Sequence, residues 1–271
     1  MKKGFTLVEI SIVLVIIGLL IGGILAAQSM IETSVINAQV RQFGQFDAMV
    51  MSFKAKYNYL PGDAPAFGGN GDGAISTGNC DSPGYVHTFF CESPNFWPSI
   101  DPKEYPGPEL SLVPPGNQPI SSGPEKNVPL AKLGIKGAFI TASALGNDYS
   151  AWGGGYILDF SDIKNFYAIL HPTQAQTPFS GLYHFSVTRN DTNNSAVKPK
   201  ELLALDTKMD DGAPATGNVI AGKMGDNGSA AGGINDSAIT NCVNGGAYQL
   251  QNDSYECTPL VRIGGAAGSP Q

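Results

Sequence analysis

The sequence predicts an α+β protein in which a long N-terminal α-helix packs on a small antiparallel sheet with long Gly- and Pro-rich loops. The first observation is a charge-free apolar run of 22 residues, from Ile10 to Ile31. The second is an amphipathic pattern that continues from Glu32 to Asn58 without a proline. The third is a set of short strand-like runs later in the chain, separated by turn residues. Together these features indicate one extended helix followed by one folded domain.

The apolar run is long enough to cross a membrane. At about 1.5 Å per helical residue it spans the ~30 Å hydrocarbon core of a bilayer. Lys2 and Lys3 precede it, so the positive-inside rule predicts a cytoplasmic N-terminus and an extracytoplasmic remainder. A secretory signal peptide has a shorter apolar core and a cleavage site on its far side. Ala26-Ala27 offers such a site, but the helical pattern continues through it.

A plain signal anchor fits the length of the run but leaves Glu9 unexplained. A carboxylate inside the membrane costs about 2.5–3.5 kcal/mol on insertion scales, so it needs a partner or a function.

The segment from Gly4 to Glu9, Gly-Phe-Thr-Leu-Val-Glu, resembles the processing motif of type IV pilins and type II secretion pseudopilins. The resemblance implies that a prepilin peptidase cuts after Gly4 on the cytoplasmic side and that the new N-terminus, Phe5, is N-methylated. It also implies that Glu9 pairs with the Phe5 ammonium of a neighbouring subunit. The expected partners are therefore the peptidase/methyltransferase, other pilin or pseudopilin subunits and an inner-membrane assembly platform.

We accordingly expect four regions in the chain. Residues 1–4 are the leader, 5–31 the membrane and filament-core half of the helix, and 32–58 its amphipathic half. Residues 59–271 form an extracytoplasmic, pilin-like globular domain. Leu60-Pro61-Gly62-Asp63 ends the helix, because proline and glycine stop the hydrogen-bonding pattern. The protein should first reside in the inner membrane as a single-pass protein and then in the pilus or pseudopilus.

The domain should combine a few regular elements with long loops. Residues 61–91 are rich in Gly, Asn, Asp and Ser, and residues 102–129 are rich in Pro, so we expect both segments to be irregular. The expected elements are the strands 156–160, 165–170, 182–188, 248–250 and 260–263, and the short helix 200–209.

The four cysteines form two close pairs, Cys80/Cys91 and Cys242/Cys257, without a Cys-x-x-Cys spacing. Even number, pairing and a membrane-targeting N-terminus predict two local disulfides in an oxidising compartment. The alternative is four reduced, buried thiols. A C-terminal disulfide loop is common in pilins, so the resemblance favours the Cys242–Cys257 pair.

Asp206, Asp210 and Asp211 form the densest acidic cluster of the chain. Asp206 and Asp210 lie one helical turn apart and would repel each other without a cation or a donor. Some pseudopilins hold a structural calcium in a C-terminal loop, so calcium is one interpretation. A solvated helix end followed by a turn is the other.

Composition limits the remaining functions. The net charge of −7 gives no electrostatic support for nucleic-acid binding. The three histidines lie far apart and no known nucleophile or phosphate-binding motif occurs, so the sequence offers no catalytic constellation. Two function classes remain. One is a structural filament subunit, and the other is a tip or adhesion subunit whose loops bind a surface or a secreted substrate.

Overall fold

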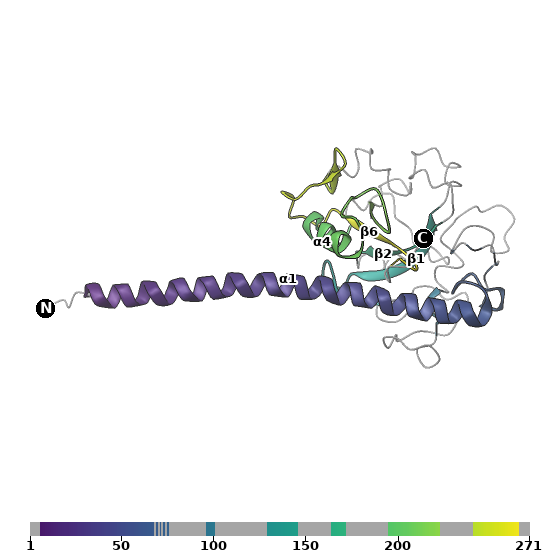
Figure 1. Cartoon of the computed structure of the whole chain (residues 1–271), viewed down its shortest axis with the longest axis horizontal. Helices are drawn as coiled ribbons and strands as arrows, with labels where there is room; N and C mark the ends of the chain where they lie inside the picture. Colours follow the sequence, from purple (N-terminus) through teal and green to yellow (C-terminus); the bar gives the residue numbers. More distant parts are fainter. Residues whose placement is uncertain are drawn as a thin grey trace, which may run out of the picture.

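A computed structural model of the chain shows one long helix with a domain packed on its C-terminal half (Figure 1). The helix, α1 (Leu7–Tyr57), is 51 residues long. The domain adds a four-stranded sheet, a two-stranded hairpin, the helix α4 (Pro199–Met209) and a short 3-10 helix, η1 (Pro65–Phe67). The structure describes residues 6–67, 69, 71, 73, 75, 96–100, 129–145, 164–171, 195–222 and 241–265.

The bounds of α1 confirm the predicted helix. Thr6 caps its N-terminus, and Asn58, in the left-handed conformation with φ 61°, ends it just before Leu60-Pro61-Gly62. Asn tolerates this conformation better than most residues, and proline cannot continue the helix. Phe5, the predicted first residue, lies outside the described residues.

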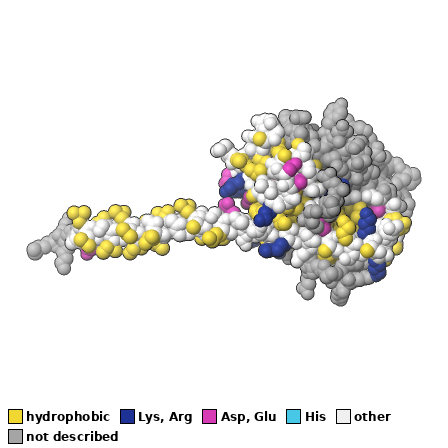
Figure 2. Space-filling model, viewed as in Figure 1, with side chains coloured by type: hydrophobic (Ala, Val, Ile, Leu, Met, Phe, Trp, Pro, Cys, Tyr) yellow, Lys and Arg dark blue, Asp and Glu magenta, His cyan; other side chains and the backbone are white. Residues whose placement is uncertain are grey.

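The two halves of α1 have different surroundings. Every buried residue of α1 lies at or beyond Ile36, whereas the apolar side chains from Leu7 to Ile31 are exposed. Hydrophobic side chains accordingly cover the part of α1 that extends beyond the domain (Figure 2). The domain therefore provides a core for one half of the helix only.

The main sheet is antiparallel, with the strand order β1-β2-β6-β3. Phe139 pairs with Leu170 at one end of the β1–β2 ladder, and Val261 of β6 pairs with Tyr167 on one side and Val219 on the other. The sheet strands are β1 (Phe139–Leu145), β2 (Lys164–Leu170), β3 (Val219–Gly222) and β6 (Thr258–Arg262). The hairpin strands are β4 (Val243–Asn244) and β5 (Ala247–Tyr248).

Several predicted elements are confirmed. The predicted strands 165–170 and 260–263 correspond to β2 and β6, and the predicted helix 200–209 corresponds to α4. The predicted strand 248–250 overlaps β5 only at Tyr248. The predicted strands 156–160 and 182–188 lie outside the described residues. β1 and β3 were not predicted, because Ala and Ser dominate the end of β1 and β3 is only four residues long.

Aromatic side chains join α1 to the sheet. The Phe43 ring stacks on the Tyr167 ring of β2 with centroids 5.6 Å apart, and Phe46 meets Trp97 edge to face at 4.6 Å. Trp97 also stacks on Tyr167 at 6.1 Å, and its indole nitrogen donates to the Ile140 carbonyl of β1 at 3.0 Å. All four aromatic side chains are fully buried, so this cluster is the centre of the core.

Buried polar side chains of α1 tie other segments to the helix. The side-chain oxygen of Gln39, Oε1, accepts hydrogen bonds from the backbone N–H groups of Lys132 and Leu133, at 2.8 and 3.0 Å. The Asp47 carboxylate accepts from the Tyr167 hydroxyl at 3.2 Å and from the Gly264 N–H at 2.8 Å. Burial, with the nearby Asp47 charge, holds the pKa of the Tyr167 phenol well above its usual range. Buried polar groups need such partners, so these bonds set how the loops lie on α1.

We predict that Phe46→Ala destabilises the domain by about 3–5 kcal/mol, because it leaves a cavity between α1 and Trp97. The measurement is urea unfolding of the full chain in detergent, followed by tryptophan fluorescence. Ile12→Ala is the matched control, because Ile12 is 55% exposed and outside the core. Equal shifts of the unfolding midpoint in the two variants would contradict the predicted role of Phe46.

Candidate functional site

The first candidate site is the start of α1, where Thr6 and Glu9 form a capping box. The Glu9 Oε2 atom accepts from the Thr6 backbone N–H at 2.7 Å and from the Thr6 hydroxyl at 2.8 Å. The Thr6 hydroxyl oxygen in turn accepts from the Glu9 N–H at 3.3 Å. The first N–H groups of a helix have no partner within it, and this arrangement satisfies two of them reciprocally.

The capping box lies at the far end of the exposed apolar half of α1, away from the domain (Figure 1). Glu9 itself is exposed in the isolated chain. Gly4 and Phe5, the predicted cleavage and methylation residues, lie outside the described residues. Within the described part of the chain, α1 is the one helix that is long and apolar enough to cross a membrane.

Residues 1–25 match the family model described as the prokaryotic N-terminal methylation motif. The chain has a prepilin-type N-terminus. The motif supports a type IV pilin-like or pseudopilin protein, and the long helix with its small antiparallel sheet is consistent with a pilin fold. No curated protein and no solved structure matches the chain.

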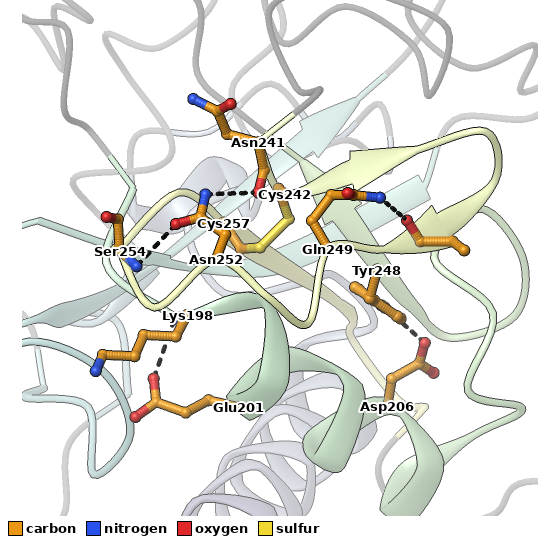
Figure 3. Close-up of a disulfide and its surroundings, with 11 residues drawn as sticks. Lys198, Glu201, Asp206, Asn241, Cys242, Tyr248, Gln249, Asn252, Ser254 and Cys257 are labelled. Atoms are coloured by element: carbon orange, nitrogen blue, oxygen red, sulfur yellow. Dashed lines mark hydrogen bonds between the residues drawn. A yellow bond between two sulfur atoms is a disulfide. The ribbon is translucent and has the colours of Figure 1, made fainter.

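The second candidate site of this prepilin-type chain is its C-terminal disulfide loop, residues 242–257. A disulfide joins Cys242 to Cys257, and the β4–β5 hairpin lies between them (Figure 3). The Cys257 N–H donates to the Val197 carbonyl at 2.9 Å, which fixes the loop beside the start of α4. The other pair, Cys80 and Cys91, lies outside the described residues.

The disulfide loop contacts both ends of α4. At the N-terminal end, the Lys198 ammonium lies 2.8 Å from the Asp253 carboxylate and 5.4 Å from the centre of the Tyr255 ring. The hydrogen bond to Asp253 raises the pKa of Lys198. Near the C-terminal end, the Tyr248 hydroxyl donates to the buried Asp206 carboxylate at 2.7 Å (Figure 3). The loop therefore bridges the length of this helix.

The structure brings the three predicted acidic residues together at the C-terminal end of α4. Ligand oxygens of Asp206, Asp210 and Asp211 all lie within 4.8 Å of one another. Each carboxylate also accepts protein hydrogen bonds, which tie the end of α4 to the turn before β3 and to the disulfide loop. The donors are the N–H groups of Gly212, Ala213, Asn218 and Val219 and the hydroxyls of Thr216 and Tyr248.

These hydrogen bonds show one use for the cluster, and calcium binding stays a prediction. A carboxylate has about four acceptor positions, so the hydrogen bonds leave capacity for a cation. Burial raises the pKa of Asp206 to about 6, although the hydrogen bonds from Tyr248 and Gly212 lower it and the neighbouring carboxylates raise it further. The Thr216 hydroxyl and the Ala213 N–H lower the pKa of Asp211. Sequence reasoning found the three aspartates but not Tyr248, because its contact with Asp206 joins residues 42 positions apart.

We predict that replacing both Cys242 and Cys257 by serine lowers the free energy of unfolding by about 3 kcal/mol, because the disulfide closes a 15-residue loop. The measurement is the urea midpoint of the full chain, with and without reductant. Cys80 and Cys91 are replaced by serine in both the parent and the variant, so that a second disulfide cannot affect the measured difference in stability. A midpoint that is the same in the oxidised parent and in the serine variant would contradict the prediction.

We also predict that Asp206 makes the folded domain less stable as the pH rises from about 4 to about 6. The folded carboxyl, with a pKa of about 6, binds its proton more tightly than the unfolded one, whose pKa lies near 4. This contribution is therefore fully present below about pH 4 and is lost as the pH rises through about 6. The measurement is the Tm of the full chain with a chelator across this pH range.

Asp206→Asn should remove this part of the pH dependence, because an amide does not titrate. The control is Asp253→Asn, because the Asp253 side chain is 92% exposed. This variant should keep the pH dependence of the parent. If both variants kept the slope of the parent, Asp206 would not be its source. A rise of the Tm at pH 7 on adding calcium would support the metal interpretation of the cluster.

Proposed function

We propose that this chain is a structural subunit (a pilin, minor pilin or pseudopilin) of a type IV pilus-like or type II secretion filament. The precursor is cut after Gly4 by a prepilin peptidase, methylated at Phe5 and assembled through its N-terminal helix. The observation that carries the proposal is the prepilin-type motif at the start of a helix whose apolar half its own domain leaves uncovered.

The uncovered half of α1 requires a partner environment. Its apolar side chains from Leu7 to Ile31 are exposed, including Leu7 at 89% and Leu19 at 73%. Soluble monomers rarely expose a continuous apolar surface of this size. A bilayer covers such a surface before assembly, and the helices of neighbouring subunits cover it in a filament. Both environments are apolar, so the transfer between them needs no large change in the helix.

Glu9 gives assembly its direction and specificity in this proposal. Cleavage after Gly4 creates an ammonium group on Phe5, and a carboxylate in an apolar bundle is stabilised by an opposite charge. A subunit in the bundle is therefore favoured where its Glu9 meets the Phe5 ammonium of a neighbour. A subunit inserted in another register would leave both charges uncompensated in an apolar environment.

The same reasoning gives the location of the parts. Lys2 and Lys3 hold the leader in the cytoplasm, residues 5–31 cross the inner membrane, and residues 59–271 fold on the outer side. The disulfide of the C-terminal loop suits an oxidising compartment. The motif belongs to structural proteins rather than enzymes, which supports a role in a filament. A tip or adhesion subunit remains the second candidate, because residues 59–271 are numerous for a simple building block.

We predict that Glu9→Ala is cut normally but assembles poorly, because only the neutralising contact is lost. Intact mass and N-terminal sequencing of the membrane-extracted chain measure processing, and recovery of sheared filaments measures assembly. Glu32→Ala is the matched control, because this exposed carboxylate follows the apolar run. Gly4→Glu provides the uncut reference, since it puts a bulky charge at the scissile bond. Normal filaments of the Glu9→Ala chain would refute the assembly role.

A further inference from the structure

The end of the apolar run fixes which part of the domain lies closest to a membrane that α1 crosses. The 22 residues from Ile10 to Ile31 have a helical length of about 33 Å, close to the ~30 Å of the hydrocarbon core. Glu32 follows directly, and its carboxylate lies 3.1 Å from the Lys200 ammonium of α4. The start of α4 therefore lies at the level where α1 leaves the hydrocarbon and enters the headgroup layer.

Two exposed lysines lie close to this level, in the segment before β1. The Lys132 N–H donates to Gln39 at 2.8 Å, and Gln39 lies about eight residues, or ~12 Å, beyond the end of the apolar run. Lys136 follows Ile135, whose N–H donates to the Ala196 carbonyl at 2.8 Å, just before α4. Figure 2 shows Lys and Arg side chains, with acidic side chains beside them, on the end of the domain from which the apolar half of α1 extends.

A polar ridge on α1 leads from the edge of the apolar run to a third exposed cation, Arg41. Side chains four residues apart share one face of a helix, and here they line a shallow groove of about 380 Å³. The groove residues are Ser29, Met30, Thr33, Ser34, Asn37 and Arg41. The hydroxyls of Ser29 and Thr33 donate to helix carbonyls. The side chains of Asn37 and Arg41 form no hydrogen bond with a described residue, so their N–H donors remain for a ligand.

Three acidic side chains near the start of α4 already have protein partners. The Glu32 carboxylate pairs with Lys200, and the Asp253 carboxylate pairs with Lys198 at 2.8 Å. The Glu201 carboxylate accepts from the Lys198 backbone N–H at 3.0 Å. These anions therefore compensate the two lysines at the start of α4 and the start of the helix itself.

Arg41, Lys132 and Lys136, in contrast, form no ion pair with any residue that the structure describes. We propose that they bind anionic phospholipid headgroups of the leaflet that α1 leaves beside Glu32, with one lipid phosphate in the groove at Arg41. A guanidinium presents two parallel N–H donors that match phosphate oxygens, and Asn37 adds an amide donor. The inference rests on the proposed function, because the chain has to reside in the membrane before assembly.

The cations are close enough to the membrane surface for this contact. The headgroup layer adds about 5–8 Å to each side of the hydrocarbon core, and the Debye length is ~8 Å at physiological salt. Arg41 lies ~15 Å beyond Ile31, and side chains on a helix tilt toward its N-terminus, which here is toward the bilayer. Because the chain has a net charge of −7, anionic lipid repels the rest of its surface. Attraction confined to this end would therefore set how the domain lies on the bilayer.

The test is a titration of the full chain, in neutral dodecyl maltoside micelles, with dihexanoyl-phosphatidylglycerol. The chain has three arginines, so 15N-arginine labelling gives few side-chain signals, and the Arg41→Gln variant assigns the Arg41 Nε–H. We expect a saturable shift of this signal, and none with dihexanoyl-phosphatidylcholine, which has no net charge. Lys132→Gln and Lys136→Gln should each raise the apparent dissociation constant about fivefold, the factor expected for one cation at an anionic lipid surface.

Two further variants separate a phosphate site from a general effect of charge. Lys54→Gln is the matched control, because Lys54 is an exposed lysine of α1 that lies ~20 Å farther from the membrane than Arg41. It should leave the dissociation constant unchanged. Arg41→Lys keeps the charge but loses the two parallel donors, so it should retain less lipid than the wild type and more than Arg41→Gln. Native mass spectra of the lipid-bound chain provide the readout for both Arg41 variants.

Several results would overturn the inference. One is unchanged lipid binding in the triple variant Arg41→Gln/Lys132→Gln/Lys136→Gln. Another is a loss in Lys54→Gln as large as the loss in that triple variant. Inorganic phosphate that binds as tightly as the anionic lipid would assign the groove to a soluble anion and would equally reject a lipid surface.

The outcomes also distinguish this inference from the proposed function. If the chain is not cut in cells that possess the peptidase, the filament function fails, whereas the lipid titration still reports on the three cations. If the chain enters filaments but shows no charge-dependent lipid binding, the filament function stands and this inference fails. If the triple variant binds lipid like the wild type but does not enter filaments, these cations contact a second copy of the chain instead, and the inference is again overturned.

Discussion

The structure depends on the burial of one aromatic face of α1 against the sheet. Phe43 and Phe46 from α1 meet Tyr167 from β2 and Trp97 from the 96–100 segment, and all four rings are fully buried. Asp47 adds hydrogen bonds to Tyr167 and Gly264 at the same level. Because this contact joins residues about 120 positions apart, it fixes the sheet on the helix, and the loops and α4 are arranged around it.

The two halves of α1 differ in how their apolar surface is covered. From Ile36 onward the chain covers α1 with its own domain, whereas the apolar first half is left exposed by that domain. The boundary coincides with a change in residue type, from a run without charges to alternating polar and apolar positions. A single continuous helix can therefore serve both as part of a folded domain and as an element of a larger assembly.

Sequence reasoning succeeded where the pattern is local and strong. The long helix, its end at Leu60-Pro61-Gly62, β2, β6 and α4 all follow from periodicity and from helix-breaking residues. The strands β1 and β3 were not predicted from the sequence. Short strands with small side chains are stabilised by their neighbours in the sheet rather than by their own composition. The capping box has Thr6 and Glu9 at the spacing that such a box requires, but the hydrogen bonds themselves are seen only in the structure.

The disulfide loop could be predicted only in part, for a similar reason. The spacing of Cys242 and Cys257 predicts a local bridge, and the structure has that bridge. The contacts of the loop with Lys198 and Asp206 at the two ends of α4 join residues more than 40 positions apart, so no local sequence pattern predicts them. Long-range polar contacts depend on tertiary packing, and for that reason only the structure reveals them.

The unbroken course of α1 has a geometric consequence for assembly. The 27 residues from Glu9 to Ile36, where the buried face begins, correspond to about seven and a half helical turns and ~40 Å. Positions Glu9 and Ile36 therefore lie on nearly opposite sides of the helix. Because a rigid helix transmits rotation, the azimuth of the domain relative to Glu9 is set by the number of residues between them. One residue more or less between them would turn the domain by about 100°.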